Sequence, residues 1–136
     1  MDGSHRFLEY IAASPEDDLA RLVYADWLEG AGDDLAAFIR ADCALAAWPA
    51  GDPARGELSA RRDALLRAGG ETWLAPLCEV PGLTSRWVRG LATCAVSLDA
   101  FLTHHVALTR CRAVLGVEVS GHFGNSLVRH RTSSFG

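Results

Sequence analysis

Asp26 is the residue whose position most suggests chemistry. It follows Leu22 and Val23 by four and three residues in a segment with helical periodicity, so the sequence predicts a carboxylate on the apolar side of a helix. A buried carboxylate needs hydrogen-bond donors. It acts either as a catalytic acid or base, or as the acceptor of a structural hydrogen bond from the next helix's amides or from Arg40. Buried carboxylates occur in structural networks as well as in active sites, and we favour the structural role.

Two adjacent histidines, His104 and His105, are the next candidates for catalysis or metal binding. Neighbouring residues on a helix point about 100° apart, so the pair lacks the i, i+4 spacing of helical zinc sites. A thiolate from Cys94 or Cys111 would have to join His105 to make a zinc site or a nucleophile pair. The four cysteines lie far apart and form no C-x-x-C pair, and we therefore expect neither a metal nor another cofactor.

Two acidic pairs, Asp17-Asp18 and Asp33-Asp34, carry the oxygen ligands that magnesium and calcium prefer. They lack the glycine-centred alternation of an EF-hand loop. Each pair lies where a helix is expected to begin, and a carboxylate there is stabilised by free amides and by the positive end of the helix without any ion. These pairs are therefore predicted to cap helices.

The tryptophans are candidates for a binding surface, because tryptophan is a frequent anchor of protein interfaces. Helical spacing predicts that Trp27 belongs to the core. Trp48 lies beside a proline and Trp87 lies between polar residues, so both are predicted to be partly exposed. Together with Glu118, which alternates with apolar positions of a predicted strand, Trp48 and Trp87 are the predicted binding residues.

Helical periodicity dominates the first two thirds of the chain and predicts a bundle of four to five helices. The second helix is predicted to run from about Pro15 to Glu29, with Gly30 or Gly32 ending it. Its predicted inward residues are Leu19, Leu22, Val23, Asp26 and Trp27. The other helices are predicted around Phe7 to Ile11, from Asp33 or Asp34 to Trp48, and over the segment that ends at Gly69-Gly70.

The pattern changes after Pro81-Gly82. Alternating β-branched and aromatic residues favour a strand over residues 86–98, with a bulge or turn at Gly90. A helix through Arg110 and a second strand at 114–119 follow, which predicts a β-α-β portion. Residues 122–136 have little periodicity, and we expect a flexible C-terminal tail. The sequence therefore predicts a single α+β domain, mostly α, over residues 1–121.

Composition narrows the function classes. The 136-residue chain has a formal net charge of −4, and all thirteen of its basic residues are arginine. An acidic balance argues against a nucleic-acid surface, and the lack of lysine excludes lysine-based catalysis. The N-terminus does not resemble a secretory signal, and no apolar run approaches the roughly 20 residues of a membrane span. We therefore expect a cytoplasmic protein without nucleic-acid or membrane partners.

The segment from Ser14 to Glu29, SPEDDLARLVYADWLE, closely resembles the bacterial repeat-companion domain, as do the following Gly32-Asp33 and Phe38-Ile39-Arg40. The segment beginning Arg86-Trp87-Val88-Arg89-Gly90-Leu91 looks like the family's downstream half, so the similarity covers roughly residues 5 to 120. The chain departs from the family at Ala36-Ala37, where an acidic residue is usual. The residues of the structural motif implied by the resemblance are Arg21, Tyr24, Asp26, Trp27 and Arg40.

In that family the module commonly stands in front of leucine-rich or other repeats, and no general catalytic activity is attached to it. The resemblance therefore implies a noncatalytic protein-interaction or repeat-capping module that binds a protein partner. The alternative is a small hydrolase or metal-dependent enzyme that uses Asp26 with His104, His105 or a cysteine.

The C-terminal portion, residues 113–121, resembles the opening strand of one leucine-rich repeat, and no second repeat follows it. A single repeat cannot bury its apolar face alone. We expect the strand to pair with residues 91–98 and to leave one backbone edge open. A partner strand, a repeat array or a second copy of the chain would then dock on that edge.

Overall fold

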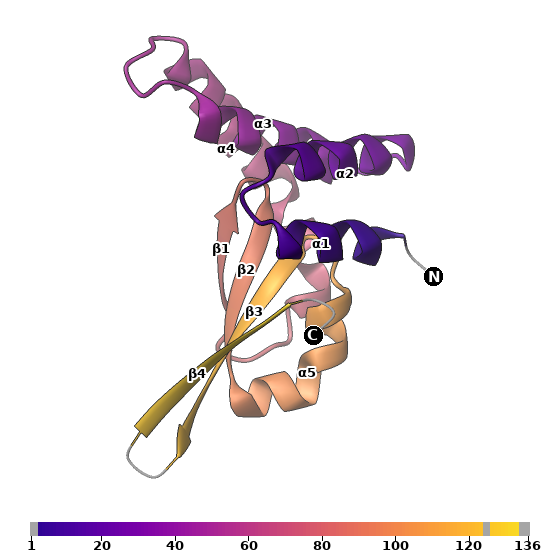
Figure 1. The fold of residues 1–136 in the computed structure, drawn as a ribbon, viewed down its shortest axis with the longest axis vertical. Helices are drawn as coiled ribbons and strands as arrows, with labels where there is room; N and C mark the ends of the chain where they lie inside the picture. Colours follow the sequence, from indigo (N-terminus) through magenta and orange to yellow (C-terminus); the bar gives the residue numbers. More distant parts are fainter. Residues whose placement is uncertain (1–2, 124–125, 134–136) are drawn as a thin grey trace.

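The computed structural model describes residues 3–123 and 126–133, with side chains through residue 121. Four α-helices and a 3-10 turn precede the first strand, and a fifth helix lies between two strands (Figure 1). The fold is α+β and mostly helical, as the sequence predicts. The elements are α1 (Ser4–Ala13), α2 (Asp18–Gly30), α3 (Leu35–Ala47), α4 (Arg55–Trp73), η1 (Ala75–Leu77), β1 (Thr84–Val88), β2 (Leu91–Ser97), α5 (Leu98–Arg110), β3 (Val114–Phe123) and β4 (Ser126–Ser133).

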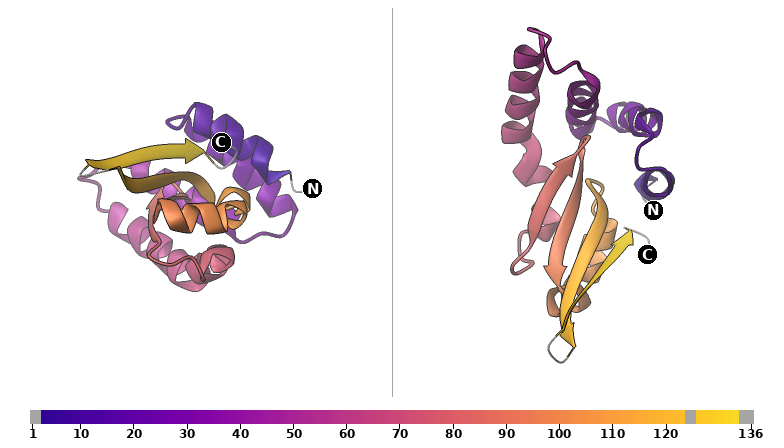
Figure 2. Two further views of the ribbon diagram at one scale, coloured as in Figure 1. Left: turned by 90° about the horizontal axis from the view of Figure 1, so that it is seen from below. Right: turned by 60° about the vertical axis from the view of Figure 1, so that its left-hand side comes forward.

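The first four helices and α5 lie on different parts of the sheet. Successive helices from α1 to α4 pack on one another, and they lie across one end of the sheet, with α1 also against β3 (Figures 1 and 2). α5 packs on β2 and β3 at the other end. One hydrophobic core joins the helices to the sheet, and its largest buried side chains include Tyr24, Phe38, Trp73 and Leu108. Among the described residues, none of the helices combines the length and the apolar character needed to span a bilayer.

The second helix begins later than predicted and buries a different face. Asp17 is its N-cap, and its carboxylate accepts a hydrogen bond of 3.0 Å from the amide of Leu19. The residues predicted to face inward are all exposed, and the buried residues are Ala20, Arg21, Tyr24, Ala25 and Leu28. α2 is apolar on two sides, and its contacts with α1 and α3 determine which side is covered. The predicted inward face was therefore wrong.

The predicted β-α-β unit is present. β2 and β3 pair in parallel, with α5 as the crossover between them. β1 precedes this unit and pairs antiparallel with β2 through a two-residue turn at Arg89 and Gly90, whose φ values are 49° and 88°. Positive φ at both positions is typical of the type I′ hairpin turn, which has the twist that joins two strands tightly. The turn predicted at Gly90 is therefore confirmed.

The C-terminal segment differs from the expectation of a flexible tail after residue 121. β3 continues to Phe123, and β4 pairs antiparallel with it from Gly116↔Ser133 to Phe123↔Ser126, so the strand order is β1-β2-β3-β4. The edge of β3 that was expected to be open is therefore covered. Main-chain hydrogen bonds hold an edge strand whose side-chain pattern gives only a weak strand signal. Residues 124–125 and 134–136 of the expected tail lie outside the described residues.

Candidate functional site

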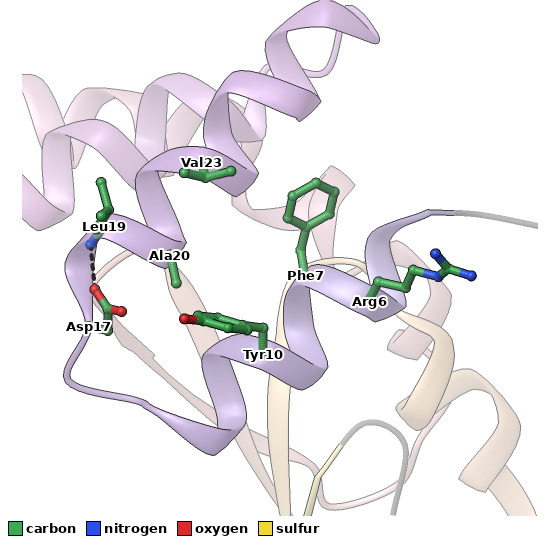
Figure 3. Close-up of a pocket in the computed structure, with 7 residues that line it drawn as sticks. All are labelled: Arg6, Phe7, Tyr10, Asp17, Leu19, Ala20 and Val23. Atoms are coloured by element: carbon green, nitrogen blue, oxygen red, sulfur yellow. Dashed lines mark hydrogen bonds between the residues drawn. The ribbon is translucent and has the colours of Figure 1, made fainter.

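An apolar groove lies between α1 and α2 (Figure 3). Its volume is about 380 Å³. Arg6 lies at one end and Asp17 at the other, so that the groove has a cation and an anion at opposite ends. The residues that line it are Arg6, Phe7, Tyr10, Asp17, Leu19, Ala20 and Val23.

The walls of the groove follow from helical spacing. Phe7 and Tyr10 are three residues apart on α1, and Leu19 and Val23 are four apart on α2, so each pair lies on one side of its helix. Ala20 between them is too small to fill the space. Leu19 is 69% exposed and Val23 is 48% exposed, although both are aliphatic. Leu19 and Val23 therefore form an apolar surface that no other part of the described chain covers.

Aromatic contacts hold one wall of the groove in place. The ring of Phe7 lies 5.4 Å from that of Tyr24 and 5.4 Å from that of Trp27, measured between centroids. Trp27 was predicted to be a core residue, but it is partly exposed and packs against the start of α1, with Gly3 beneath its indole ring. These contacts join α1 to α2, so the groove lies between two helices that pack on each other.

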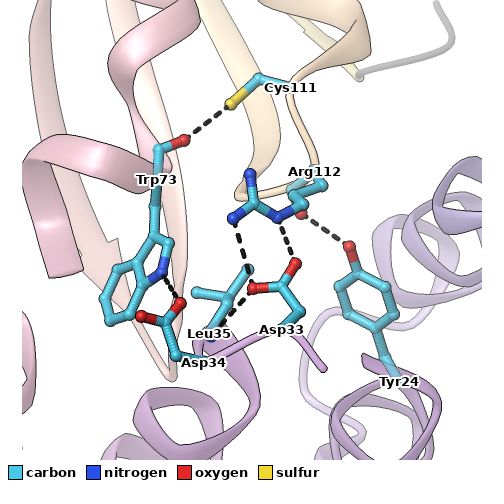
Figure 4. Close-up of polar contacts among 7 residues, drawn as sticks. All are labelled: Tyr24, Asp33, Asp34, Leu35, Trp73, Cys111 and Arg112. Carbon is cyan, nitrogen blue, oxygen red and sulfur yellow. Dashed lines mark hydrogen bonds and ion pairs between the residues drawn. The ribbon is translucent and has the colours of Figure 1, made fainter. Parts of the chain in front are cut away.

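A polar network behind the groove ties the helices to the sheet (Figure 4). The hydroxyl of Tyr24 donates a hydrogen bond of 2.8 Å to the carbonyl oxygen of Arg112, which lies between α5 and β3. The guanidinium of Arg112 pairs with the carboxylate of Asp33, and this hydrogen bond raises the pKa of Arg112. Asp34 accepts a hydrogen bond of 2.7 Å from the indole nitrogen of Trp73. The second acidic pair therefore joins separate parts of the chain.

The two segments that carry the family resemblance, Ser14 to Glu29 and the segment beginning at Arg86, meet at the tip of the β1–β2 hairpin. Arg21, from the first motif, is buried and donates to the carbonyl oxygen of Pro15, and its burial lowers its pKa. Arg89, at the hairpin tip, lies 3.3 Å from the carboxylate of Asp18. The carbonyl of Arg89 also accepts a hydrogen bond from the thiol of Cys43. Arg89 thus joins the hairpin to α2 through Asp18 and to α3 through Cys43, which is a structural role.

Asp26 lies on the surface, contrary to the prediction that it is buried. Its side chain is 74% exposed, and one carboxylate oxygen lies 2.6 Å from Nη2 of Arg40. Arg40 also pairs with Glu29, and these two hydrogen bonds raise its pKa. The predicted partner, Arg40, is therefore correct and the predicted environment is wrong. One error, the wrong choice of the buried face of α2, explains why both Asp26 and Trp27 were predicted to face the core.

The residues of the alternative enzyme hypothesis are not brought together. Asp26 lies on α2 and pairs with Arg40 of α3, whereas His104 and His105 lie on α5 at the other end of the molecule (Figure 1). Burial raises the pKa of Cys94 to about 12 and also raises that of Cys111, which keeps both thiols protonated at neutral pH. Within the described residues, no three histidine, cysteine or acidic side chains are grouped so that they would hold a metal ion.

The predicted binding residues are spread over three places. Trp48 is partly exposed at the end of α3. Trp87 is half-buried on β1 and makes edge contacts with Phe38 and Trp73, with centroids 5.2 and 6.0 Å away. Glu118 is half-buried in β3, opposite Ala95 of β2. These three residues therefore do not form one surface.

Sequence reasoning missed the groove because it assigned Leu19 and Val23 to the core. The sequence of α2 did contain a signal, because its apolar residues lie on two sides of the helix. A surface helix normally buries only one side against its neighbours, so the other side is expected to be exposed. The resemblance to the repeat-companion family stays a prediction from the motifs, because comparison of the chain with protein-family models, with curated proteins and with solved structures finds no match.

Proposed function

We propose that the protein is a noncatalytic protein-interaction module that holds an apolar segment of a partner protein in the groove between α1 and α2. The observation that carries this proposal is the exposure of Leu19, Val23 and Tyr10 around one hollow on two packed helices. Burying an aliphatic side chain is worth about 1.5–3 kcal/mol, so a partner that covers these residues gains affinity from each of them.

The dimensions of the groove favour a few inserted side chains. A volume of about 380 Å³ is near the lower end of the range for binding pockets, about 300–1,000 Å³. An amphipathic helix that presents apolar residues at i, i+3 and i+4 has the shape to fill a groove between two helices. Arg6 and Asp17 at its two ends would orient such a helix by charge, because reversing the helix would reverse its charges relative to the groove.

Two other interpretations have less support. An enzyme using Asp26 with His104, His105 or a cysteine would need these groups in one pocket, and Asp26 is instead an exposed partner of Arg40. A repeat-capping role at the edge of β3 would require the displacement of β4 from its ladder. The groove needs no such rearrangement, and protein interaction through it is therefore the function that we favour.

A matched pair of substitutions tests the groove. Leu19→Glu places a charge on its wall, and Leu102→Glu does the same on α5, where the leucine is 63% exposed compared with 69% for Leu19. Both are surface changes and should leave the free energy of unfolding within about 0.5 kcal/mol of wild type. We expect Leu19→Glu to lower recovery of the partner from native lysate by about tenfold or more, whereas Leu102→Glu retains it.

A photo-cross-linker identifies the partner segment directly. Benzoylphenylalanine in place of Tyr10, which is exposed beside the groove, should cross-link to one protein, and Leu19→Glu in the same chain should abolish the adduct. If Leu19→Glu and Leu102→Glu recover the same proteins in equal amounts, and the cross-link survives Leu19→Glu, the groove is not the binding site.

A further inference from the structure

A second apolar surface lies on α5, away from the groove. Leu98, Leu102 and Val106 follow one another at four-residue spacing and form a stripe, which we call the α5 stripe. Leu102 is 63% exposed and Val106 is 50% exposed. On its other side the same helix buries Ala100 and Leu108 against the sheet.

α5 therefore carries apolar residues toward the sheet and also, between polar residues such as Thr103 and His105, toward solvent. A surface helix of a globular protein normally has a polar outer face, and a helix that is apolar all round is normally covered on both sides. Leu102 and Val106 of the α5 stripe are largely exposed, whereas Leu98 is 38% exposed and lies beside Gly121 of β3. The stripe consequently has the character of an interface.

We infer that the α5 stripe is the contact surface between two copies of this chain, which pair with their α5 helices antiparallel. The charges at the ends of the helix specify this occupant and this direction. Asp99 lies in the first turn of α5 and Arg110 in its last turn, and both are exposed. Antiparallel pairing brings Asp99 of each copy to Arg110 of the other, whereas parallel pairing brings like charges together.

The spacing of the residues agrees with a single two-fold axis. With the axis at the level of His104, Leu102 of each copy lies opposite Val106 of the other, because both are two residues from the axis. At about 1.5 Å of rise per residue, Asp99 and Arg110 of the other copy then differ in height by only about 1.5 Å. One register therefore satisfies the apolar and the charged contacts together.

The helical backbone of α5 is also interrupted at His104, where the proposed axis lies. His104 has φ −117° and ψ 15°, which interrupts the helix between Leu102 and Val106. A two-fold axis there makes the first half of each α5 pack on the second half of the other. The interruption thus lies at the centre of the proposed interface.

The size of the stripe predicts a reversible dimer. From Leu98 to Val106 the stripe is about 12 Å long, and one helix face of this length belongs to the small class of interfaces that bury less than about 1,200 Å². We expect a dissociation constant on the order of 10–100 μM. Sedimentation velocity of the full chain from about 5 to about 500 μM spans this range and should show the sedimentation coefficient rising with concentration.

Substitutions in the stripe separate this dimer from other contacts. Leu102→Glu and Val106→Glu should each raise the dissociation constant at least about tenfold, because a charge replaces an apolar contact on both sides of the axis. Leu19→Glu is the matched control, and its dimer should form as in wild type. If Leu19→Glu also abolishes self-association, the stripe binds the α1–α2 groove of another copy, and the symmetric dimer is wrong.

A charge exchange tests the direction of the helices. Asp99→Arg and Arg110→Asp should each weaken the dimer several-fold at low ionic strength, and the double variant should restore it, because the ion pairs are then present in reverse. A double variant as weak as either single variant excludes antiparallel pairing. A wild-type chain that stays monomeric up to about 500 μM excludes the proposal as a whole. Either result leaves the groove between α1 and α2 unaffected, since the groove is tested by the capture of a different protein.

Discussion

The buried carboxylate of Asp42 in α3 accepts a hydrogen bond of 2.7 Å from the backbone amide of Gly90, at the tip of the β1–β2 hairpin. The two residues are 48 positions apart in the chain. The hairpin turn leaves this amide without a partner in the sheet ladder, and Asp42 supplies the acceptor that a buried N–H needs. This bond fixes the hairpin to α3, which in turn packs on α2.

Removal of the Asp42 carboxylate should therefore destabilise the protein. We expect Asp42→Ala to lower the free energy of unfolding by about 1–3 kcal/mol, because it leaves a buried donor unpaired. Asp42→Asn retains one carbonyl oxygen and should recover part of the loss. Asp63→Ala is the control, since both Asp42 and Asp63 pair with Arg62, but the side chain of Asp63 is 47% exposed compared with 11% for Asp42. Equal urea midpoints for Asp42→Ala and Asp63→Ala would contradict the assignment.

Gly90 itself should tolerate no side chain. Its φ is 88°, and a Cβ added to it would overlap the Cα of Ile39. Gly82 has a similar φ of 69° but open space around it, so the two glycines separate backbone strain from overlap. We expect Gly82→Ala to cost about 1–2 kcal/mol and Gly90→Ala more than about 3 kcal/mol in urea denaturation. Equal losses in the two variants would show that packing on Ile39 is unimportant.

The order of the helices and the β-α-β unit were predictable from the sequence, whereas β4 and the exposed face of α2 were not. Alternation around Gly90 and the helix between two strands are local patterns, and they correctly indicated a bulge or turn at Gly90 and a β-α-β unit. The face of α2 depends on where α1 and α3 pack, which no local pattern records, and Leu19 and Asp26 were consequently placed inside. β4 was missed because its pairing with β3 depends on main-chain hydrogen bonds, which any residue except proline donates.

Asp26 provides a test of the corrected face of α2. A buried carboxylate would make Asp26→Ala costly, but the exposed pair with Arg40 should be worth at most about 1 kcal/mol. We therefore expect the urea midpoint of Asp26→Ala to lie close to that of wild type and well above that of Asp42→Ala. The difference from wild type should shrink further in high salt, because salt screens exposed ion pairs. A loss of stability as large as that of Asp42→Ala would show that Asp26 is buried after all.

The reactivity of the four thiols should follow their burial. Cys78 is exposed, whereas Cys43, Cys94 and Cys111 are buried. Burial raises the pKa of Cys43 to about 11 and that of Cys94 to about 12, so little thiolate is present at neutral pH. We expect one thiol per folded chain to react rapidly with a disulfide reagent, and all four to react in denaturant. Cys78→Ser should remove the rapid phase, and a second rapid thiol in that variant would place another cysteine at the surface.

Burial of the Cys94 thiol also makes the free energy of unfolding fall as the pH rises in the alkaline range. The ordinary pKa of Cys94 is 9.0, and burial raises it to about 12 in the folded chain. Between these values the unfolded chain has lost the thiol proton while the folded chain keeps it, so rising pH favours unfolding. The contribution is complete below about pH 9 and is lost as the pH approaches 12.

Urea midpoints measured at steps between pH 8 and about 11 should therefore fall. Cys94→Ala removes this proton from both states, and its midpoint should fall less over the same interval. If wild type and Cys94→Ala lose stability in parallel, the Cys94 thiol is not responsible for the alkaline dependence.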